Sequence, residues 1–212
     1  MLVAGLTGGF ASGKSFIGQV LEECGCRLIR ADDLGHEALA VDSPVYRGVL
    51  TEFGNDILKS DGTIDRRRLG ALVFADTERL ARLNELVHPY VFARQEERIA
   101  ELGARDPNAI VVVEAAIMIE TGSYKRYDAI ILAVCDVETQ IARAMKRDGL
   151  SREEVLSRLD RQMPLAEKIP YAQFVIDTDQ TREEVITRTQ QVYESLRAMQ
   201  QSKLEISRGP LL

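Results

Sequence analysis

The stretch Gly8-Gly-Phe-Ala-Ser-Gly-Lys-Ser15 matches the pattern G-x-x-x-x-G-K-[ST]. An apolar run at residues 2–6 precedes it, and residues 16–23 follow with the spacing of a helix. Glycines at these positions let the backbone turn tightly, so that successive N–H groups point at phosphate oxygens. An ordinary glycine-rich turn is the alternative, but the position between an apolar strand and a helix favours a phosphate-binding loop.

The pattern assigns a role to each part of the predicted loop. Lys14 is expected to reach the β and γ phosphate oxygens of ATP, and the Ser15 hydroxyl is expected to be a ligand of Mg²⁺. The helix that follows adds its positive N-terminal end. We therefore predict that ATP is a co-substrate and Mg²⁺ the cofactor. The predicted ATP-binding residues are Gly8, Gly9, Ala11, Ser12, Gly13, Lys14, Ser15 and Phe16.

Strands alternate with helices along most of the chain. Four apolar runs rich in valine and isoleucine lack polar alternation, as doubly buried parallel strands do, and a fifth run is weaker. This alternation predicts an α/β class, a P-loop three-layer fold with a parallel five-stranded sheet. The predicted strands are residues 2–6, 27–29, 110–113, 129–134 and 174–176, and the main predicted helices are residues 16–23, 78–102, 137–147 and 182–199.

One long stretch departs from this alternation. Residues 33–105 separate the second and third strands by far more than one crossover helix, and we interpret them as a helical insertion that could cover a substrate. Farther along, Ser151-Arg-Glu-Glu154 fits a capping box and starts a helix predicted to run through Gln162, with Pro164 as its limit. Residues 200–212 are expected to be loosely ordered.

The composition is that of one compact domain. The chain has 212 residues, 45% of them hydrophobic, and its three cysteines lack the pattern of a disulfide framework. The net charge of −6 argues against broad binding to nucleic acid. No segment resembles a signal peptide or the run of ~20 apolar residues that spans a bilayer. We expect a cytoplasmic protein without nucleic-acid or membrane partners, as a monomer or weak homo-oligomer.

A GTPase is one alternative for a chain with this loop. The stretch Asp32-Asp-Leu-Gly35 matches D-x-x-G, but it begins only 17 residues after Ser15. That spacing leaves no room for the strand and switch segment that usually intervene. The chain also has no Asn-Lys-x-Asp sequence for guanine, since its asparagines stand alone at positions 55, 84 and 108. We therefore discount a GTPase.

Acidic residues that follow predicted strands are candidates for chemistry, because strand carboxyl ends line the active crevice of such sheets. Asp32 follows the second strand and could accept a proton from an attacking hydroxyl. The alternative for Asp32 is a cap on a helix at residues 34–39. Glu114 follows residues 110–113 and is expected near the water ligands of the metal. Asp136 stands directly before a helix, so we interpret it as a cap.

Arginines of the second half supply candidates for transition-state stabilisation. Arg143 and Arg147 are spaced i, i+4 and share a helix face. Positive groups that close over the transferring phosphoryl group stabilise its charge and exclude water. We therefore predict both as catalytic, with Asp32 and Lys14. The other basic residues of this region, interpreted as solvated surface, are Lys146, Arg152, Arg158 and Arg161.

Several further stretches form a distinctive set. They are the loop at residues 5–15, Ala31-Asp32 with His36, the middle segments 61–69 and 73–76, Leu86-Val-His88-Pro89, and the set Gln140, Arg143, Arg147, Arg158 and Gln162. On these residues the chain resembles the dephospho-coenzyme A kinases, from about residue 2 to about residue 188. The His-Pro segment makes the resemblance specific, because most P-loop kinases lack it.

The resemblance implies that ATP phosphorylates the ribose 3′-hydroxyl of dephospho-CoA to give coenzyme A, the last step of CoA biosynthesis. It implies a core like that of the nucleoside-monophosphate kinases, with a helical CoA-binding lobe and a small helical lid. In one domain over residues 1–212, we expect the core at about 1–32, 106–142 and 171–200, the lobe at about 33–105 and the lid at about 143–170. The implied base is Asp32, and the predicted substrate-binding residues are Asp32, His36, Arg66, His88, Pro89 and Glu114.

The chain departs from the family pattern at a few positions. Arg30 replaces a frequent aspartate, residues 114–120 replace the usual Asp-x-Pro-Leu-Leu-x-Glu, and Gln173 and Thr178 replace an aspartate and an asparagine. These departures concern the acceptor wall, the surroundings of the metal and the adenine end. Two alternatives stay open on these grounds: a kinase for another nucleotide or small alcohol, and a nucleotide-binding regulatory module without turnover.

Overall fold

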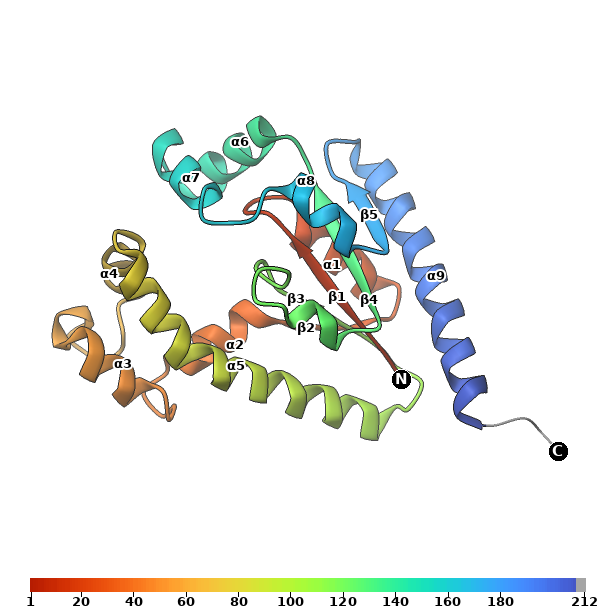
Figure 1. Ribbon diagram of the computed structural model, residues 1–212, viewed down its shortest axis with the longest axis horizontal. Coiled ribbons are helices and arrows are strands. Elements are labelled where there is room, and N and C mark those ends of the chain that lie inside the picture. Colours follow the sequence, from red (N-terminus) through yellow and green to blue (C-terminus); the bar gives the residue numbers. More distant parts are fainter. Residues whose placement is uncertain (209–212) are drawn as a thin grey trace. The chain divides into compact units, whose positions relative to one another are not determined.

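All five predicted strands form, and they assemble into one parallel sheet (Figure 1). The structure is a computed structural model that describes residues 1–208. Strand β1 lies at the centre, between β3 and β4, and it reaches two residues farther than predicted. The sheet order is β2 (Arg27–Arg30), β3 (Ile110–Glu114), β1 (Leu2–Gly8), β4 (Ala129–Val134) and β5 (Phe174–Asp177).

The register of the strands fixes where the site lies. Leu6 pairs with Glu114 of β3, and Gly8 pairs with Ala133 of β4. The carboxyl end of the central strand is therefore flanked by the carboxyl ends of its two neighbours. In open parallel sheets, ligands bind in the crevice outside such strand ends, at the place where the strand order changes direction.

The chain divides into two compact units, and each is described by itself. The first consists of Met1–Ile29 and the chain from Glu101 onward, and the second consists of Arg30–Ala100. The first unit holds the sheet and its main core, in which Leu2, Ala4 and Leu6 of β1 are fully buried. These three residues lie on one face of the strand because side chains alternate along a β-strand.

Helices α1 (Lys14–Glu23) and α9 (Arg182–Arg208) contact each other, and both contact the sheet. Met118 and Tyr127 lie against the other face, where a side chain at Gly5 would collide with both of them. The remaining helices of the first unit are α6 (Val137–Asp148), α7 (Arg152–Leu159), α8 (Leu165–Lys168) and the short 3₁₀ helices η2 (Ser123–Arg126) and η3 (Ile169–Tyr171).

The second unit is helical and has a core of its own, formed by Val49, Ile57, Ile64, Leu69 and Val73. Its first helix is joined to its last by the Glu37 carboxylate, which pairs with Arg98 and lies 4.0 Å from Arg94 Nε. The elements of this unit are α2 (Ala31–Ala38), α3 (Tyr46–Phe53), η1 (Asn55–Ile57), α4 (Arg66–Phe74) and the part of α5 (Thr77–Arg105) that reaches Ala100.

The capping box of α7 is confirmed, but the predicted end of that helix is wrong. The Ser151 side chain accepts from the Glu154 N–H at 3.2 Å, and the Ser151 N–H donates to Glu154 Oε2 at 2.7 Å. The helix ends at Leu159 rather than at Gln162. The chain turns after Leu159, and the Gln162 side chain accepts a hydrogen bond from Phe10, in the loop after β1.

Two further predictions need correction. Asp136 occupies the N-cap position of α6, but its side chain makes no capping hydrogen bond. The tail was expected to be loosely ordered from residue 200, yet α9 continues to Arg208. Lys203 Nζ binds both carboxylate oxygens of Asp128 at 2.7 and 2.8 Å, which ties this part of the helix to the turn before β4. The rest of that prediction, residues 209–212, lies outside the described residues.

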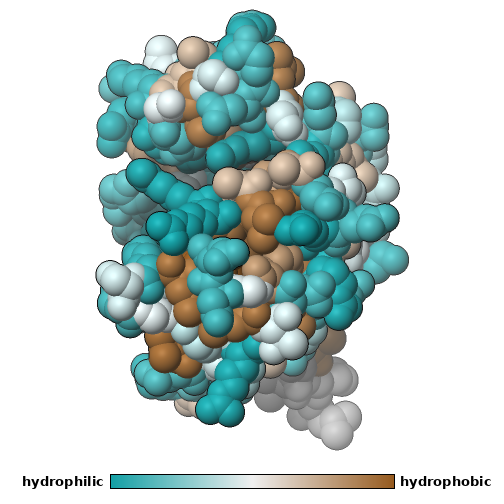
Figure 2. Space-filling view, turned by 90° about the vertical axis from the view of Figure 1, so that its left-hand side faces the viewer, coloured by the Kyte–Doolittle hydropathy of each residue, from teal (hydrophilic) through white to brown (hydrophobic). Residues whose placement is uncertain are grey.

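The residues in view in Figure 2 are mostly hydrophilic, with hydrophobic ones among them. Among the described residues, no helix combines the length and the apolar composition needed to cross a bilayer.

Candidate active site

The loop between β1 and α1 has a backbone that its glycines make possible. Gly13, the N-cap of α1, has a φ of 87°, and a Cβ there would lie 3.1 Å from Thr178 Cγ2. A side chain at Gly9 would collide with the amide nitrogen of Gln140. The loop leads directly into the positive N-terminal end of α1. No side-chain hydrogen bond caps this end. A loop backbone of this kind at the N-terminus of a helix is suited to binding phosphate.

The two side chains that end the motif lie against the loop and its neighbour strand. Lys14 Nζ donates to Gly9 O at 2.7 Å and to Gly8 O at 3.3 Å, so the lysine folds back over the loop. The Ser15 hydroxyl donates to Glu114 Oε1 at 2.8 Å. The structure thus brings the predicted metal ligand Ser15 together with the predicted carboxylate Glu114, which is 8% exposed.

A cavity of about 470 Å³ opens beside the loop. Its walls come from the loop, from the first turn of α1 and from one face of α6. Four of its side chains, Lys14, Arg143, Lys146 and Arg147, are cationic, and none of its lining residues is acidic. A cleft lined by charge of one sign focuses its field and attracts ligands of the opposite sign. The full lining is Ala11, Ser12, Gly13, Lys14, Ser15, Phe16, Arg143, Lys146 and Arg147.

Arg143 is connected to the loop through Thr178. Its Nη1 donates to Thr178 Oγ1 at 2.8 Å, and its Nη2 donates to Thr178 O at 2.6 Å. The same hydroxyl donates to Ser12 O at 2.9 Å, and Thr178 is buried. A chain of hydrogen bonds therefore runs from the loop through Thr178, directly after β5, to α6. Thr178 is one of the positions at which the sequence departs from the family pattern.

Arg147 lies one turn farther along α6 and has a different partner. Its Nε and Nη2 donate to the two oxygens of Asp148 at 2.8 and 2.9 Å. This hydrogen bonding lowers the pKa of the Asp148 carboxyl below its usual value. The guanidinium carbon of Arg147 also lies 5.4 Å from the centroid of the Phe10 ring, within the range of a cation–π contact.

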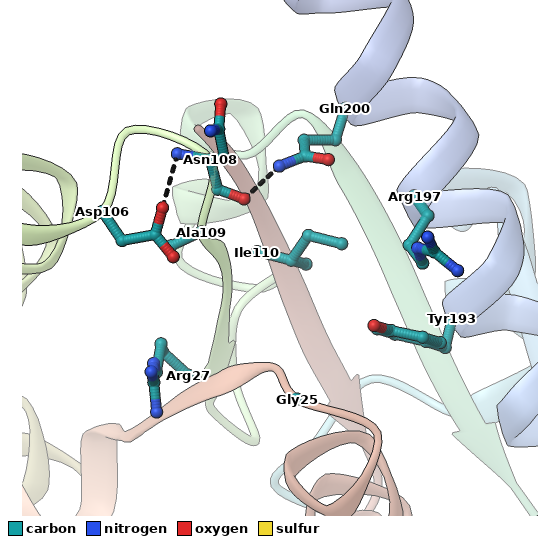
Figure 3. A pocket seen from close by; sticks show the side chains of 9 residues that line it. All are labelled: Gly25, Arg27, Asp106, Asn108, Ala109, Ile110, Tyr193, Arg197 and Gln200. Carbon is teal, nitrogen blue, oxygen red and sulfur yellow. Dashed lines mark hydrogen bonds between the residues drawn. The ribbon is translucent and has the colours of Figure 1, made fainter.

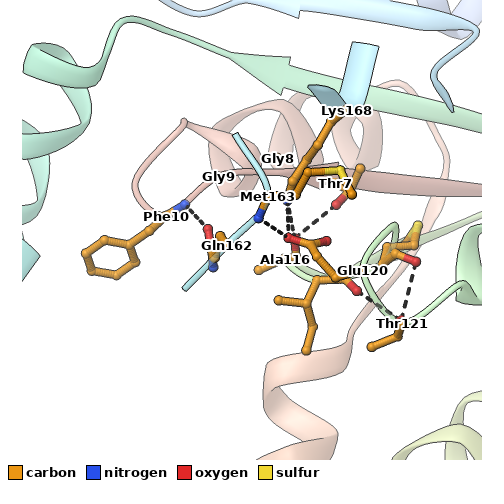
Figure 4. A network of polar contacts seen from close by, with 12 residues as sticks. Thr7, Gly8, Gly9, Phe10, Ala116, Glu120, Thr121, Gln162, Met163 and Lys168 are labelled. Atoms are coloured by element: carbon orange, nitrogen blue, oxygen red, sulfur yellow. Dashed lines mark hydrogen bonds and ion pairs between the residues drawn. The ribbon is translucent and has the colours of Figure 1, made fainter. Parts of the chain in front are cut away.

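Two glutamines hold the peptide groups of Phe10, and Figure 4 shows the bond to Gln162. The Phe10 N–H donates to Gln162 Oε1 at 2.8 Å, and Gln140 Nε2 donates to Phe10 O at 2.7 Å. Gln140 belongs to α6, whereas Gln162 belongs to the segment that follows α7. The N–H and the carbonyl of Phe10 are thus both bound by residues more than a hundred positions away in the sequence.

A sequence model described as dephospho-CoA kinase matches residues 2–206. The chain belongs to the dephospho-CoA kinase family. A dephospho-CoA kinase of Geobacter sulfurreducens is 42% identical over 193 residues, which cover 91% of this chain and 98% of the relative.

Two solved structures agree with this membership. A protein from Thermus thermophilus has a TM-score of 0.79 and 31% identity, and the match covers 92% of this chain and 96% of that one. A dephospho-CoA kinase from Campylobacter jejuni has a TM-score of 0.69 and 27% identity, covering 92% and 97%. The predicted P-loop fold and the predicted family are therefore confirmed.

The family resemblance also placed residues on the second unit. Asp32 and His36 both lie on α2, and both are exposed. The N-cap of α2 is Arg30, which makes no side-chain capping bond, so Asp32 is the second residue of the helix rather than its cap. An acidic side chain in this first turn interacts favourably with the helix dipole. Because Asp32 belongs to the second unit, its role toward the loop stays a prediction.

The other acceptor residues of the dephospho-CoA kinase resemblance also lie in this unit. Arg66 is the exposed first residue of α4, after Asp65, which caps that helix. His88 and Pro89 lie within α5, and the His88 ring centroid is 5.8 Å from that of Phe92. Burial lowers the pKa of His88, which favours the neutral imidazole at pH 7. Their contact with an acceptor remains a prediction.

Several residues of the site could not be found from local patterns. Lys146 was interpreted as surface and is exposed, but the sequence did not reveal that it also lines the cavity with Arg143 and Arg147. The roles of Phe10 and Thr178 depend on partners far away in the sequence. The signal for Gln140 and Gln162 was their presence in the set of residues typical of dephospho-CoA kinases, but that set did not reveal that both bind the loop.

A buried ion pair supports the segment that carries Gln162 (Figure 4). The Lys168 side chain is fully buried, and its Nζ lies 2.7 Å from Glu120 Oε1. The same Glu120 oxygen accepts from the Met163 N–H at 3.1 Å. Lys168 Nζ and Thr7 Oγ1 both donate to Ala116 O at 3.2 Å. The segment of residues 162–168 is thereby fastened to the chain that follows β3.

Removing the two partners of this pair is expected to have unequal effects. Glu120→Gln leaves the buried Lys168 ammonium without a counter-charge, and we expect a loss of about 3 kcal/mol in the free energy of unfolding. Lys168→Met fills a similar volume. The Glu120 side chain that remains is 21% exposed, and its carboxylate keeps the hydrogen bond from the Met163 N–H. We expect this variant to lose about 1 kcal/mol or less. Urea unfolding of both variants checks the order, and equal losses would contradict it.

A second, smaller cavity lies at the amino-terminal end of β3 (Figure 3). It measures about 140 Å³ and contains none of the residues predicted for the kinase site. Its hydrogen bonds are structural, since Asp106 Oδ1 accepts from the Asn108 N–H at 2.9 Å and Gln200 donates to Asn108 O. These contacts join α9 to the turn that precedes β3.

Proposed function

We propose that this chain is a dephospho-CoA kinase, which transfers the γ-phosphoryl group of ATP to the ribose 3′-hydroxyl of dephospho-CoA. The observation that carries the proposal is the cationic cavity beside the loop, in a chain of this family. Lys14 and the start of α1 form one wall of this cavity, and Arg143 and Arg147 of α6 form the other. A phosphate chain between these walls would meet positive charge on both sides.

The residues of the cavity would share the work of binding and transfer. The loop amides and the positive end of α1 would hold the β phosphate, with Lys14 reaching the β and γ oxygens. Arg143 and Arg147 would stabilise the charge that spreads over the γ-phosphoryl oxygens in the transition state. Thr178, which holds the Arg143 guanidinium at 2.6–2.8 Å, would orient that group toward the cavity.

The residues beside the loop fit Mg²⁺, which this family's use of ATP suggests. The Ser15 hydroxyl and the Glu114 carboxylate are hard oxygen donors 2.8 Å apart, of the type that Mg²⁺ prefers. Among the described residues, no three His, Cys, Asp or Glu side chains are grouped to hold a metal by themselves. Ser15 would therefore hold the ion together with phosphate oxygens, and Glu114 would bind its waters. The ion would neutralise charge on the phosphates.

The acceptor side of the proposal rests on the second unit. Asp32 would take the proton from the 3′-hydroxyl as the hydroxyl oxygen bonds to the γ phosphorus. The bond between that phosphorus and the β–γ bridging oxygen would break, and ADP would leave. His36, Arg66, His88 and Pro89 would bind the acceptor. A neutral His88 would accept or donate a hydrogen bond without adding charge.

A coupled ADP-release assay tests the function. With ATP and Mg²⁺, we expect dephospho-CoA to give much higher kcat/KM than a panel of nucleosides, nucleotides and small alcohols. Phosphorus NMR of the product should place the new phosphate on the ribose 3′-oxygen. Preference for another acceptor would replace the proposed substrate, and ATP binding without turnover on any acceptor would favour a regulatory module.

A further inference from the structure

Phe10 occupies a position at which phosphate binding does not require a particular side chain. It is the third residue of the G-x-x-x-x-G-K-[ST] motif, where only the backbone is needed to hold phosphate. Its two peptide groups are nevertheless fixed by Gln162 and Gln140. These two hydrogen bonds fix the backbone that carries the Phe10 side chain. Figure 4 shows the ring directed away from Gln162.

The Phe10 ring lies against the two helices that follow β4. It packs with a small apolar cluster whose buried members are Ile141 and Ala144 of α6 and Val155 of α7. No other stretch of the first unit before β4 contributes a residue to this cluster except Phe10 and its neighbour Ala11, as far as the described residues show. The loop therefore reaches the apolar contacts between α6 and α7 through this one ring and one methyl group.

Two arginines meet the same ring. The guanidinium carbon of Arg147 lies 5.4 Å from the ring centroid, and that of Arg158 lies 5.3 Å from it. Two cations near each other repel, and the electron-rich face of an aromatic ring attracts them. The Asp148 carboxylate offsets part of the repulsion between the two arginines. Its pKa is lowered by its hydrogen bonds with Arg147 and by the charge of Arg158.

We propose that Phe10 is a positioning residue for Arg147, with Arg158 beside it. The inference rests on the proposed kinase function, because Arg147 is one of the groups expected to stabilise the transferring phosphoryl group. Arginine has many rotamers, and fixing one of them in advance removes an entropic cost from nucleotide binding. The ring holds the Arg147 guanidinium at the edge of the cationic cavity, so that loop and arginine form one preassembled phosphate site.

The substitution Phe10→Leu isolates the ring. It keeps the peptide groups that bind Gln162 and Gln140 and retains an apolar side chain in the cluster, but it removes the aromatic face. We expect kcat to fall by about 5-fold and the affinity for a non-hydrolysable ATP analogue to fall by about 3-fold. Phe10→Tyr keeps the face and should restore both values. Phe74→Leu makes the same change at an exposed site in the second unit, and should leave the affinity for the ATP analogue unchanged.

A double-mutant cycle with Arg147→Ala separates positioning from packing. If the ring acts through Arg147, Phe10→Leu should change kcat and analogue affinity by less than about 2-fold once that arginine is absent. Equal losses in the two backgrounds would overturn the proposal, because the ring would then only pack α6 and α7. If Phe10→Leu causes no loss in the protein that retains Arg147, the proposal is overturned as well.

The two readouts distinguish failure of this inference from failure of the proposed function. An unmodified chain that does not phosphorylate dephospho-CoA would contradict the function. The cycle measured on analogue affinity by calorimetry would still report whether ring and arginine are coupled. Coupling in that measurement supports the positioning role, and additivity refutes it. Thermal unfolding of each variant confirms that the losses arise in folded protein.

Discussion

Lys14→Ala is expected to reduce turnover by at least about 10³-fold while leaving the fold intact. The Lys14 ammonium group is the only charge in the loop motif itself. We expect it to stay in contact with the β and γ phosphate oxygens in the transition state and to stabilise their negative charge. Removing it takes away a charge-assisted contact in a cavity where the other cations come from α6. The variant also loses the hydrogen bonds to Gly8 O and Gly9 O. The loop is then less constrained, which adds to the loss.

A matched change on the opposite wall shows whether the position of the charge matters. Lys146→Ala removes the same charge from the same cavity, but from α6 rather than from the loop. We expect its turnover to fall by less than about 10-fold. Steady-state kinetics of both variants, with circular dichroism and thermal unfolding as checks of folding, make the comparison. Near-normal turnover in folded Lys14→Ala protein would refute the assignment of the loop.

Asp32→Asn is expected to lower turnover by roughly 10² to 10⁴, the range typical of a lost general base. The amide keeps the shape of the carboxylate but cannot take the proton. Lys14, Ser15 and the loop amides are unchanged, so nucleotide affinity should hardly move. The loss should appear in kcat more than in KM, because the interaction matters most in the transition state. Kinetics and calorimetry with an ATP analogue measure the two effects.

Asp33 provides the matched control. It is also exposed and lies in the same first turn of α2, so Asp33→Asn removes the same charge from the same helix end. The favourable interaction of either carboxylate with the helix dipole is worth about 0.3–1 kcal/mol, which both variants lose. Only Asp32→Asn should lose turnover. Equal activities in the two variants would contradict catalysis by Asp32, and weaker binding of ATP with Mg²⁺ would indicate a metal ligand instead.

The local patterns in the sequence predicted the sheet and the loop well. The three inner strands β1, β3 and β4 were found because both of their faces are buried, so that their apolar runs are nearly continuous. The loop was found because its chemistry requires glycine, lysine and serine at fixed spacing. Gly8 shows the limit of such patterns, since it both begins the motif and pairs with Ala133 as the last residue of β1.

What the sequence did not reveal depends on contacts between distant residues. Lys168 follows Glu167, and nothing in the local sequence marks it as buried, yet it is fully buried against Glu120. Thr178 was noted only as a departure, although its hydroxyl joins the loop to Arg143. Helix α9 extends beyond its predicted end, and Lys203 in this extension binds the Asp128 carboxylate before β4. The roles of Asp32 and the acceptor residues remain predictions that the experiments above address.

The central place of β1 has a consequence for the order of events during synthesis. This strand is synthesised before both of its neighbours, which begin only at Ile110 and Ala129. Closing so long a loop costs entropy before any ladder hydrogen bond forms, so we expect the pairing of β1 to come late in folding. The core of Arg30–Ala100 is complete in the nascent chain before then. The loop after β1 binds Gln140, Gln162 and Thr178, so we expect it to acquire its shape only after most of the polypeptide has been made.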